Sequence, residues 1–319
     1  MAGHVAPIER TASALDSLLL QIVRGVEPTA AQKEGARASH HRLRELLDTG
    51  QMASRIIGSY LSGSYARDTA IKPIDDVDII FEIDPGRWPR SSLLSTLPSP
   101  DQVLESFATA IRRRYRVSSV YGQRRSVRLQ LHHIDIDIVP VAPHETDPLM
   151  IYVPDREAGE WIKSSPRRHA DMATRVNTKR NGKFKPLIKL VKLWNSKLPD
   201  TVRCKSFLIE TIAIRLFDQK SFGTLGEGLV LFWDFLASRY NEPTVNPAWG
   251  DYGMSFSWLS VSVPDTAGTG ANVAARLDRS RARALASKAR ISRDKILAAY
   301  EARAAATQRR MALSALRAR

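Results

Sequence analysis

The sequence predicts an α+β fold, with a mixed sheet and its helices in the first half and a helical lobe in the second. Two observations predict it. Short apolar segments with strand-like alternation recur between residues 56 and 141, whereas helical periodicity dominates from residue 161 onward. The pattern changes near residues 141–161, so we expect two domains, residues 1–155 and residues 156–319.

In the first domain, Thr29 is a plausible N-cap and Gly50 a plausible end for a helix over 29–47. The other helices expected in this domain cover 12–23 and 102–115, and the strands cover 56–61, 77–83, 117–120, 126–132 and 134–141. In the second domain the expected helices cover 185–197, 206–217, 225–239 and 291–306, with an irregular stretch at 241–270.

Composition excludes several classes of protein. Hydrophobic residues at 43% and charged residues at 25% are typical of a globular chain. One cysteine cannot form an intrachain disulfide or a cysteine-based zinc cluster. There is no apolar run of membrane-spanning length, and the first residues lack the pattern of a signal peptide. We therefore expect a cytoplasmic protein that makes no membrane contact.

The net charge of +15 is concentrated near the C-terminus. Residues 276–319 contain 13 Lys and Arg against 3 Asp and Glu. Such a segment could bind nucleic acid or a regulatory protein. The alternative is a solvated, Arg/Ala-rich helical face.

Asp76 and Asp78 alternate with apolar residues in the segment DDVDIIFE, and we interpret Asp75, which precedes them, as a cap rather than a ligand. In a strand, alternate residues share a face, so both side chains would point the same way. Like charges at the end of an apolar strand are costly unless a cation neutralises them, and Mg²⁺ prefers oxygen ligands. Pairing with Arg67 or Lys72 is the alternative that needs no metal.

A second acidic pair, Asp135 and Asp137, lies in HHIDIDIVPV and also alternates with isoleucine. One of these carboxylates could join Asp76 and Asp78 from a neighbouring strand. Three converging carboxylates suit two divalent ions that promote in-line displacement at phosphorus. The residue pattern alone does not choose between Asp135 and Asp137.

Gly63 and Ser64 precede the first acidic pair by about a dozen residues. A glycine turn leaves backbone N–H groups free to bind phosphate oxygens, and the serine hydroxyl lies beside them. The pair is weak evidence alone. Combined with two acidic strand segments downstream, it predicts a site for a nucleoside triphosphate.

These segments, GSYARDTA, DDVDIIFEI and HIDIDIVPV, resemble the nucleotidyltransferase superfamily that includes DNA polymerase β, poly(A) polymerases and oligoadenylate synthases. The resemblance is strongest to the cGAS/DncV-like nucleotidyltransferases (CD-NTases), which make cyclic oligonucleotide signals in bacterial anti-phage defence. It implies a polymerase-β-type core, a C-terminal helical lobe and an active site in the cleft between them. The family's later Asp, followed by two apolar residues and Pro, matches Asp137. Asp68 stands where the family usually has Gly.

The resemblance extends into the helical lobe. PLIKLVKLWN resembles a helix whose lysine reaches the triphosphate, which assigns that role to Lys192. KSFLIETIAI resembles the next helix, which assigns a nucleotide contact to Ser206 and base stacking to Phe207. The alternatives are an ordinary exposed Lys192 and a core position for Phe207.

The resemblance therefore implies a template-independent enzyme that joins NTPs into a cyclic di- or oligonucleotide and releases pyrophosphate. Asp76, Asp78 and Asp137 would hold two Mg²⁺ ions, with Mn²⁺ as a substitute. An effector activated by the product would act downstream. The alternatives are an RNA or tRNA 3′-end nucleotidyltransferase and an inactive nucleotidyltransferase that acts as a sensor.

Overall fold

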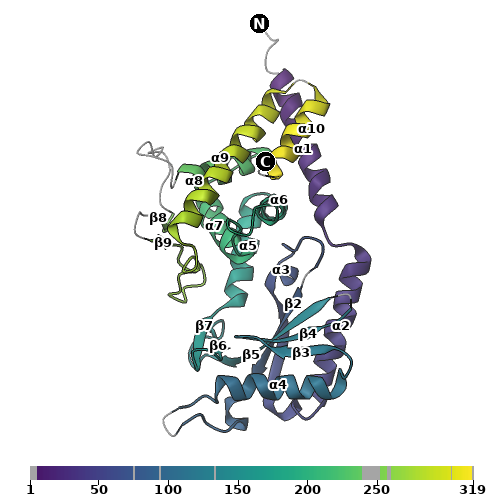
Figure 1. Cartoon of the computed structure of the whole chain (residues 1–319), viewed down its shortest axis with the longest axis vertical. Helices are drawn as coiled ribbons and strands as arrows, with labels where there is room; N and C mark the ends of the chain where they lie inside the picture. Colours follow the sequence, from purple (N-terminus) through teal and green to yellow (C-terminus); the bar gives the residue numbers. More distant parts are fainter. Residues whose placement is uncertain are drawn as a thin grey trace. The chain divides into compact units, whose positions relative to one another are not determined.

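The chain forms two compact units in a computed structural model that describes residues 6–74, 76–92, 95–132, 134–238, 252–256, 260–302 and 304–317. The sheet unit is Pro28–Ala170. The helical unit combines Met1–Glu27 with Asp171–Arg319. Figure 1 shows the elements of both.

The sheet unit is built on a mixed sheet with the strand order β1-β2-β5-β4-β3. The strands β2 and β5 run parallel, whereas the other neighbours on this path are antiparallel. Beyond the path, β6 pairs with β5 and with β7. The strands are β1 (Ile56–Ser62), β2 (Asp76–Ile83), β3 (Ser119–Gly122), β4 (Val127–Gln130), β5 (Asp135–Pro143), β6 (Ile151–Asp155) and β7 (Glu160–Ser164). This confirms the predicted α+β class.

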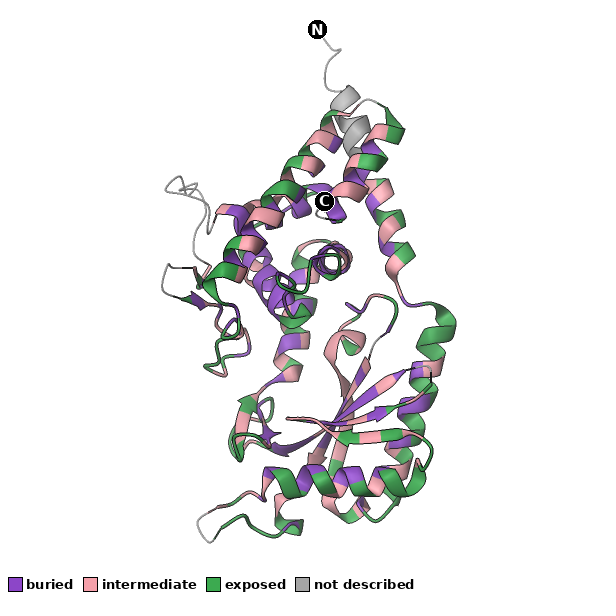
Figure 2. Ribbon diagram, in the orientation of Figure 1, coloured by how far each residue is buried: buried purple, intermediate pink, exposed green. Residues whose placement is uncertain are grey.

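Helices α2 and α4 pack on the sheet through one apolar face each. The α2 helix begins with the capping box formed by Thr29 and Gln32, as the N-cap prediction required. The buried residues of α2 lie at helical spacing on one face, and the residues of the opposite face are exposed (Figure 2). The helices and short turns of this unit are α2 (Ala30–Thr49), η1 (Ala53–Arg55), α3 (Gly63–Ala66), η2 (Pro85–Arg87) and α4 (Pro100–Arg114).

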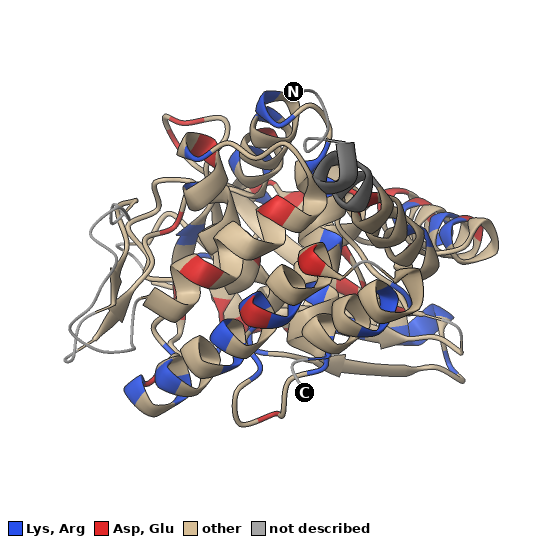
Figure 3. Cartoon of the chain, turned by 90° about the horizontal axis from the view of Figure 1, so that it is seen from above, with Lys and Arg blue, Asp and Glu red and all other residues tan. Residues whose placement is uncertain are grey.

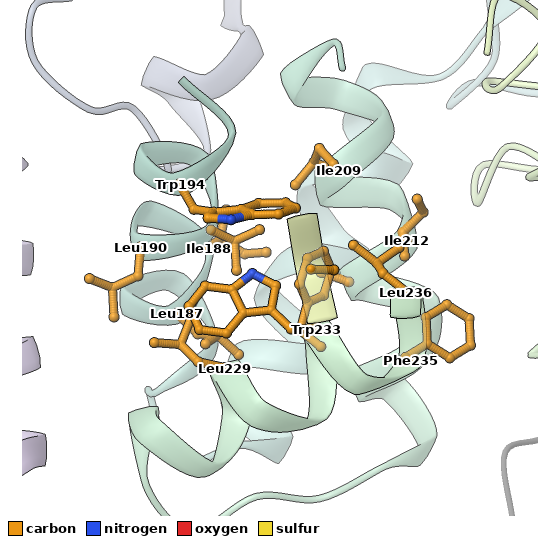
Figure 4. Close-up of a cluster of buried hydrophobic side chains, with 14 of the residues drawn as sticks. Leu187, Ile188, Leu190, Trp194, Ile209, Ile212, Leu229, Trp233, Phe235 and Leu236 are labelled. Atoms are coloured by element: carbon orange, nitrogen blue, oxygen red, sulfur yellow. The ribbon is translucent and has the colours of Figure 1, made fainter. Parts of the chain in front are cut away.

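The helical unit has its own hydrophobic core, in which the first helix of the chain packs against helices from the second half. Trp194 and Trp233 meet at its centre, with ring centroids 5.9 Å apart (Figure 4). Its elements are α1 (Ala6–Val26), α5 (Pro166–Lys179), α6 (Phe184–Ser196), α7 (Ser206–Gln219), α8 (Leu225–Ser238), β8 (Ser255–Phe256), β9 (Val261–Ser262), α9 (Arg279–Glu301) and α10 (Ala305–Leu316). The α5 helix starts in the sheet unit.

Basic residues occur on several helices rather than on a single element (Figure 3). On α9, the exposed Arg279, Arg283 and Arg290 are spaced to lie on one helix face. Among the described residues, no helix is both long and apolar enough to cross a bilayer.

The division into units differs from the expected boundary after residue 155. Residues 156–164 stay with the sheet because β7 pairs with β6 across a tight connection. The α1 helix joins the helical unit because its leucines belong to that unit's core. Sequence reasoning also missed β6, β7 and α5, and it started the last long helix at residue 291 instead of Arg279.

Candidate active site

Parallel pairing of β2 and β5 brings the two acidic segments together in register. Asp76 lies beside Asp135, and Asp78 lies beside Asp137. Because alternate residues share a face, these side chains project from one face of the sheet. We call Asp76, Asp78, Asp135 and Asp137 the acidic cluster.

Gly63 follows β1 directly and packs against this cluster. Its neighbour Ser62 is paired with Asp78 across β1 and β2. Gly63 has φ +69°, a conformation that costs little only for glycine. A Cβ atom here would lie 1.7 Å from Asp78 Oδ2, so a side chain could not fit without moving that carboxylate.

Arg128 of β4 binds the acidic cluster from the other side. It is paired directly with Asp137. Its Nε donates to Asp137 Oδ1 at 2.8 Å and its Nη2 to Asp137 Oδ2 at 2.6 Å. The same guanidinium donates to Asp76 Oδ2 at 3.3 Å and to Asp135 Oδ2 at 3.4 Å. Sequence reasoning missed Arg128, although alternation in VRLQ places it on a face opposite that of Val127 and Leu129.

Asp78 has an unusual protonation equilibrium. Burial, together with the negative charges of Asp76 and Asp137, raises the pKa of Asp78 to about 7. Arg67 and Arg128 oppose this rise without cancelling it. Arg67 thus acts on Asp78, as the metal-free alternative suggested, and Asp76 is paired with Arg128. The cluster therefore still needs additional positive charge.

The donor set fits a hard divalent ion such as Mg²⁺, because every member of the cluster offers carboxylate oxygens. In the described part of the chain, however, no group of three or more His, Cys, Asp or Glu side chains is placed to hold an ion as it stands. Asp76 and Asp137 are instead turned toward Arg128. An ion would have to draw them from the guanidinium.

The segment after Gly63 forms the short helix α3, which contains Ser64. The Ser64 carbonyl accepts a hydrogen bond from Thr69 N at 2.9 Å, which closes the loop. Asp68 has φ +56°, which explains why glycine suits this position in the family that the sequence resembles. Asp75 and His133 lie outside the described residues.

In the helical unit, Lys192 is only 4% exposed in its side chain and lies 2.9 Å from Glu210 Oε2. Glu210 is equally buried, so the pair joins α6 to α7 inside the unit. Lys192 is therefore not an ordinary exposed lysine. Ser206 and Phe207 begin α7 and are exposed, which excludes a core position for the Phe207 ring.

Comparison with solved structures identifies the fold. A structure of Escherichia coli MS115-1 CdnC with ATP matches with a TM-score of 0.73 at 20% identity, covering 95% of this chain and 97% of that one. CdnG from Bradyrhizobium diazoefficiens, solved with GTP, matches with a TM-score of 0.68 at 14% identity over 94% and 97% of the two chains. The fold is thus the polymerase-β-type fold of the CD-NTases.

Sequence comparison then identifies the family. The model of the Second Messenger Oligonucleotide or Dinucleotide Synthetase domain matches residues 14–177, and the chain belongs to this family. A cyclic AMP-AMP-AMP synthase of an Acinetobacter species is 30% identical over 206 residues, or 61% of this chain and 57% of that relative. A cyclic AMP-AMP-GMP synthase of Enterobacter hormaechei is 22% identical over 74% of this chain and 77% of its own length. The match to the Acinetobacter relative thus spans less than two thirds of its length.

Proposed function

We propose that this chain is a metal-dependent, template-independent nucleotidyltransferase that joins NTPs into a cyclic oligonucleotide second messenger. The observation that carries the proposal is the in-register acidic cluster behind Gly63, in a chain of a synthetase family. The names of its relatives support the class of product. Because the Acinetobacter relative makes cyclic AMP-AMP-AMP, ATP is the first substrate to test.

Asp76, Asp78 and Asp137 would hold two divalent ions, Mg²⁺ or Mn²⁺. When bound, such ions offset the charge of a triphosphate and favour in-line displacement at its α-phosphorus. We assign to Asp137 the activation of the attacking ribose hydroxyl. The hydroxyl oxygen forms the new bond to phosphorus, pyrophosphate leaves, and repetition of the step closes the ring.

Other residues would bind the nucleotide. Gly63 and Ser64 would contact the phosphates, as would Lys192 and Ser206, and Phe207 would stack on a base. The burial of Lys192 beside Glu210 adds a condition, because the lysine would have to reach the phosphates from this ion pair. The exposure of the Phe207 ring, at 37%, supports its assigned role.

The surroundings of the enzyme are part of the same proposal. We expect it to act in the cytoplasm in anti-phage signalling, with an effector that responds to the product. A structural neighbour, CdnC, has been solved in complex with HORMA-deltaN. A protein regulator is therefore the first partner to test, with the basic helices α9 and α10 as a contact region.

The test is product analysis. The purified protein is incubated with labelled NTPs, singly and in pairs, with Mg²⁺ or Mn²⁺; the phosphatase-resistant product is then identified by mass. We expect pyrophosphate release and a cyclic product. The D76N/D78N double variant should make none, and turnover in that variant would refute the site. Activity only with added RNA would favour the end-modifying enzyme, and no pyrophosphate under any condition would favour the sensor.

A further inference from the structure

The proposed reaction gives no role to Arg128, although this residue contacts the acidic cluster. It lies on β4, directly opposite Asp137, where oppositely charged side chains stabilise an antiparallel pair. Its side chain is 23% exposed, against 11% for Asp137. The guanidinium is thus partly shielded from solvent, and its charge acts at close range on the cluster.

The contacts of Arg128 use oxygens that a metal ion would also need. Its Nε and Nη2 hold both carboxylate oxygens of Asp137, at 2.8 and 2.6 Å. The same Nη2 reaches Asp76, and Nη1 reaches Asp135. A side-on guanidinium with two parallel hydrogen bonds is a strong, oriented contact, which a lysine would not reproduce.

We propose that Arg128 is an internal counter-cation that stands in for a divalent ion, neutralising the acidic cluster in the metal-free protein and competing with the ion for Asp76 and Asp137. The inference rests on the proposed metal site. It explains why, among the described residues, no set of three or more carboxylate side chains is arranged to hold an ion. The contact with Asp76 is longer than those with Asp137, so Asp76 is the ligand that Arg128 releases first.

The competition has a measurable consequence. A fixed positive charge next to a binding site weakens the binding of any cation there, by an amount that grows as the pair is buried. Removing the charge should therefore tighten metal binding. A residue that served only to hold the metal ligands in place would have the opposite effect, because its loss would loosen the site.

The experiment measures Mn²⁺ binding by calorimetry and electron paramagnetic resonance, without nucleotide, on the full chain. We expect R128Q to bind Mn²⁺ at least about tenfold more tightly than wild type, because a repelling charge is lost. R128K, which keeps the charge but not the two parallel hydrogen bonds, should bind Mn²⁺ more tightly than wild type and less tightly than R128Q. Equal or weaker binding by R128Q would overturn the inference.

Two controls complete the test. D78N should weaken Mn²⁺ binding in both the wild-type and R128Q backgrounds; tight binding that survives in D78N/R128Q would place the ion elsewhere and overturn the inference. If R128Q folds poorly without metal, the rise of its Tm on adding Mn²⁺ is compared with that of wild type, and it must be larger. No NTP is involved, so a wild type that binds Mn²⁺ as expected but makes no product would refute only the proposed function.

Discussion

Gly63 leaves room for the acidic cluster because it has no Cβ atom. Two constraints meet at this residue: a left-handed backbone conformation and contact with the Asp78 carboxylate. Glycine satisfies both without strain. Any side chain would meet the second constraint only by displacing a proposed metal ligand.

For this reason we expect G63A to lower pyrophosphate release and Mn²⁺ affinity by at least about 100-fold, the scale of a displacement of about 1 Å at a reaction centre. G159A is the matched control, because Gly159 has φ +70° and no atom within 4 Å of an added Cβ. In chemical denaturation G159A should lose about 1 kcal/mol of stability, and G63A at least as much, because it must also displace the Asp78 carboxylate. Equal activity in the two variants would contradict the role of Gly63.

Asp155 is a buried carboxylate of the sheet unit that lies outside the cluster and is held by several hydrogen bonds. It is 1% exposed and accepts hydrogen bonds from Arg124, Arg125 and Ala158 N. The hydrogen bonds from Arg124 and Arg125 hold its pKa well below the usual range. Its ionised form therefore stabilises the fold at neutral pH.

Replacing this carboxylate in D155N should destabilise the protein by about 3 kcal/mol at pH 7, since two arginines lose a buried partner. The folded-state pKa is depressed, so this stabilisation is present above about pH 4 and is lost as the pH falls further. The unfolding curves of D155N and wild type should thus converge on acidification. E157Q, which removes an exposed partner of Arg124, should cost less than about 1 kcal/mol.

Much of the site could be predicted from the residues alone. The apolar strand with alternating carboxylates predicted Asp76 and Asp78 on one face, and the structure has them there. Arg128 could not be assigned in this way, because its role depends on which strand lies beside β5. The choice between Asp135 and Asp137 likewise depends on register, which alternation leaves open.

The helices α6 and α7 are joined by the buried ion pair of Lys192 and Glu210. A buried ion pair adds little net stability compared with apolar residues, but losing one partner leaves a charge uncompensated. The pair thus holds Lys192, the proposed phosphate-binding lysine, in place. Removing either partner would leave the other charge buried and uncompensated.

We expect E210Q to destabilise the helical unit by about 3 kcal/mol, measured by urea unfolding. Adding K192M should recover part of this loss, because the uncompensated charge is then gone. If the double variant were less stable than E210Q, the pair would not be coupled in this way. Activity should be lost in the double variant if Lys192 binds the triphosphate, because only that variant lacks the lysine.

Elements with strong local signals were predicted well, and elements that depend on distant partners were not. The capping box of Thr29 and the end at Gly50 fixed α2 within a residue or two. By contrast, β6 and β7 contain few alternating residues and are held by pairing with each other. Helix α9 begins at the Asp278 cap, in a segment whose many arginines conceal its apolar face.

The helical unit is assembled from both ends of the chain. Leu15, Leu19 and Val23 of α1 are buried in a core whose other members lie beyond residue 170. The first helix is therefore a structural part of the helical unit, although it is separated from it in sequence by the entire sheet unit.

This arrangement predicts very different losses of stability when two neighbouring leucines are replaced by alanine. L19A should cost about 3 kcal/mol, because Leu19 is fully buried and its loss leaves a cavity. L20A should cost less than about 1 kcal/mol, since Leu20 is 38% exposed. Hydrogen exchange can locate the loss of stability in L19A, and we expect faster exchange only in the helices of this unit. Faster exchange in the sheet would contradict the division of the chain into two units.

The discontinuous helical unit also has a consequence for synthesis on the ribosome. The first helix emerges before the sheet unit, but α6, α8, α9 and α10, which it contacts, emerge after it. The apolar side chains of α1 therefore stay unburied until these helices have been synthesised, while Pro28–Ala170 folds. A nascent chain arrested before residue 184 would expose this stripe to chaperones, and release of the finished chain would close it.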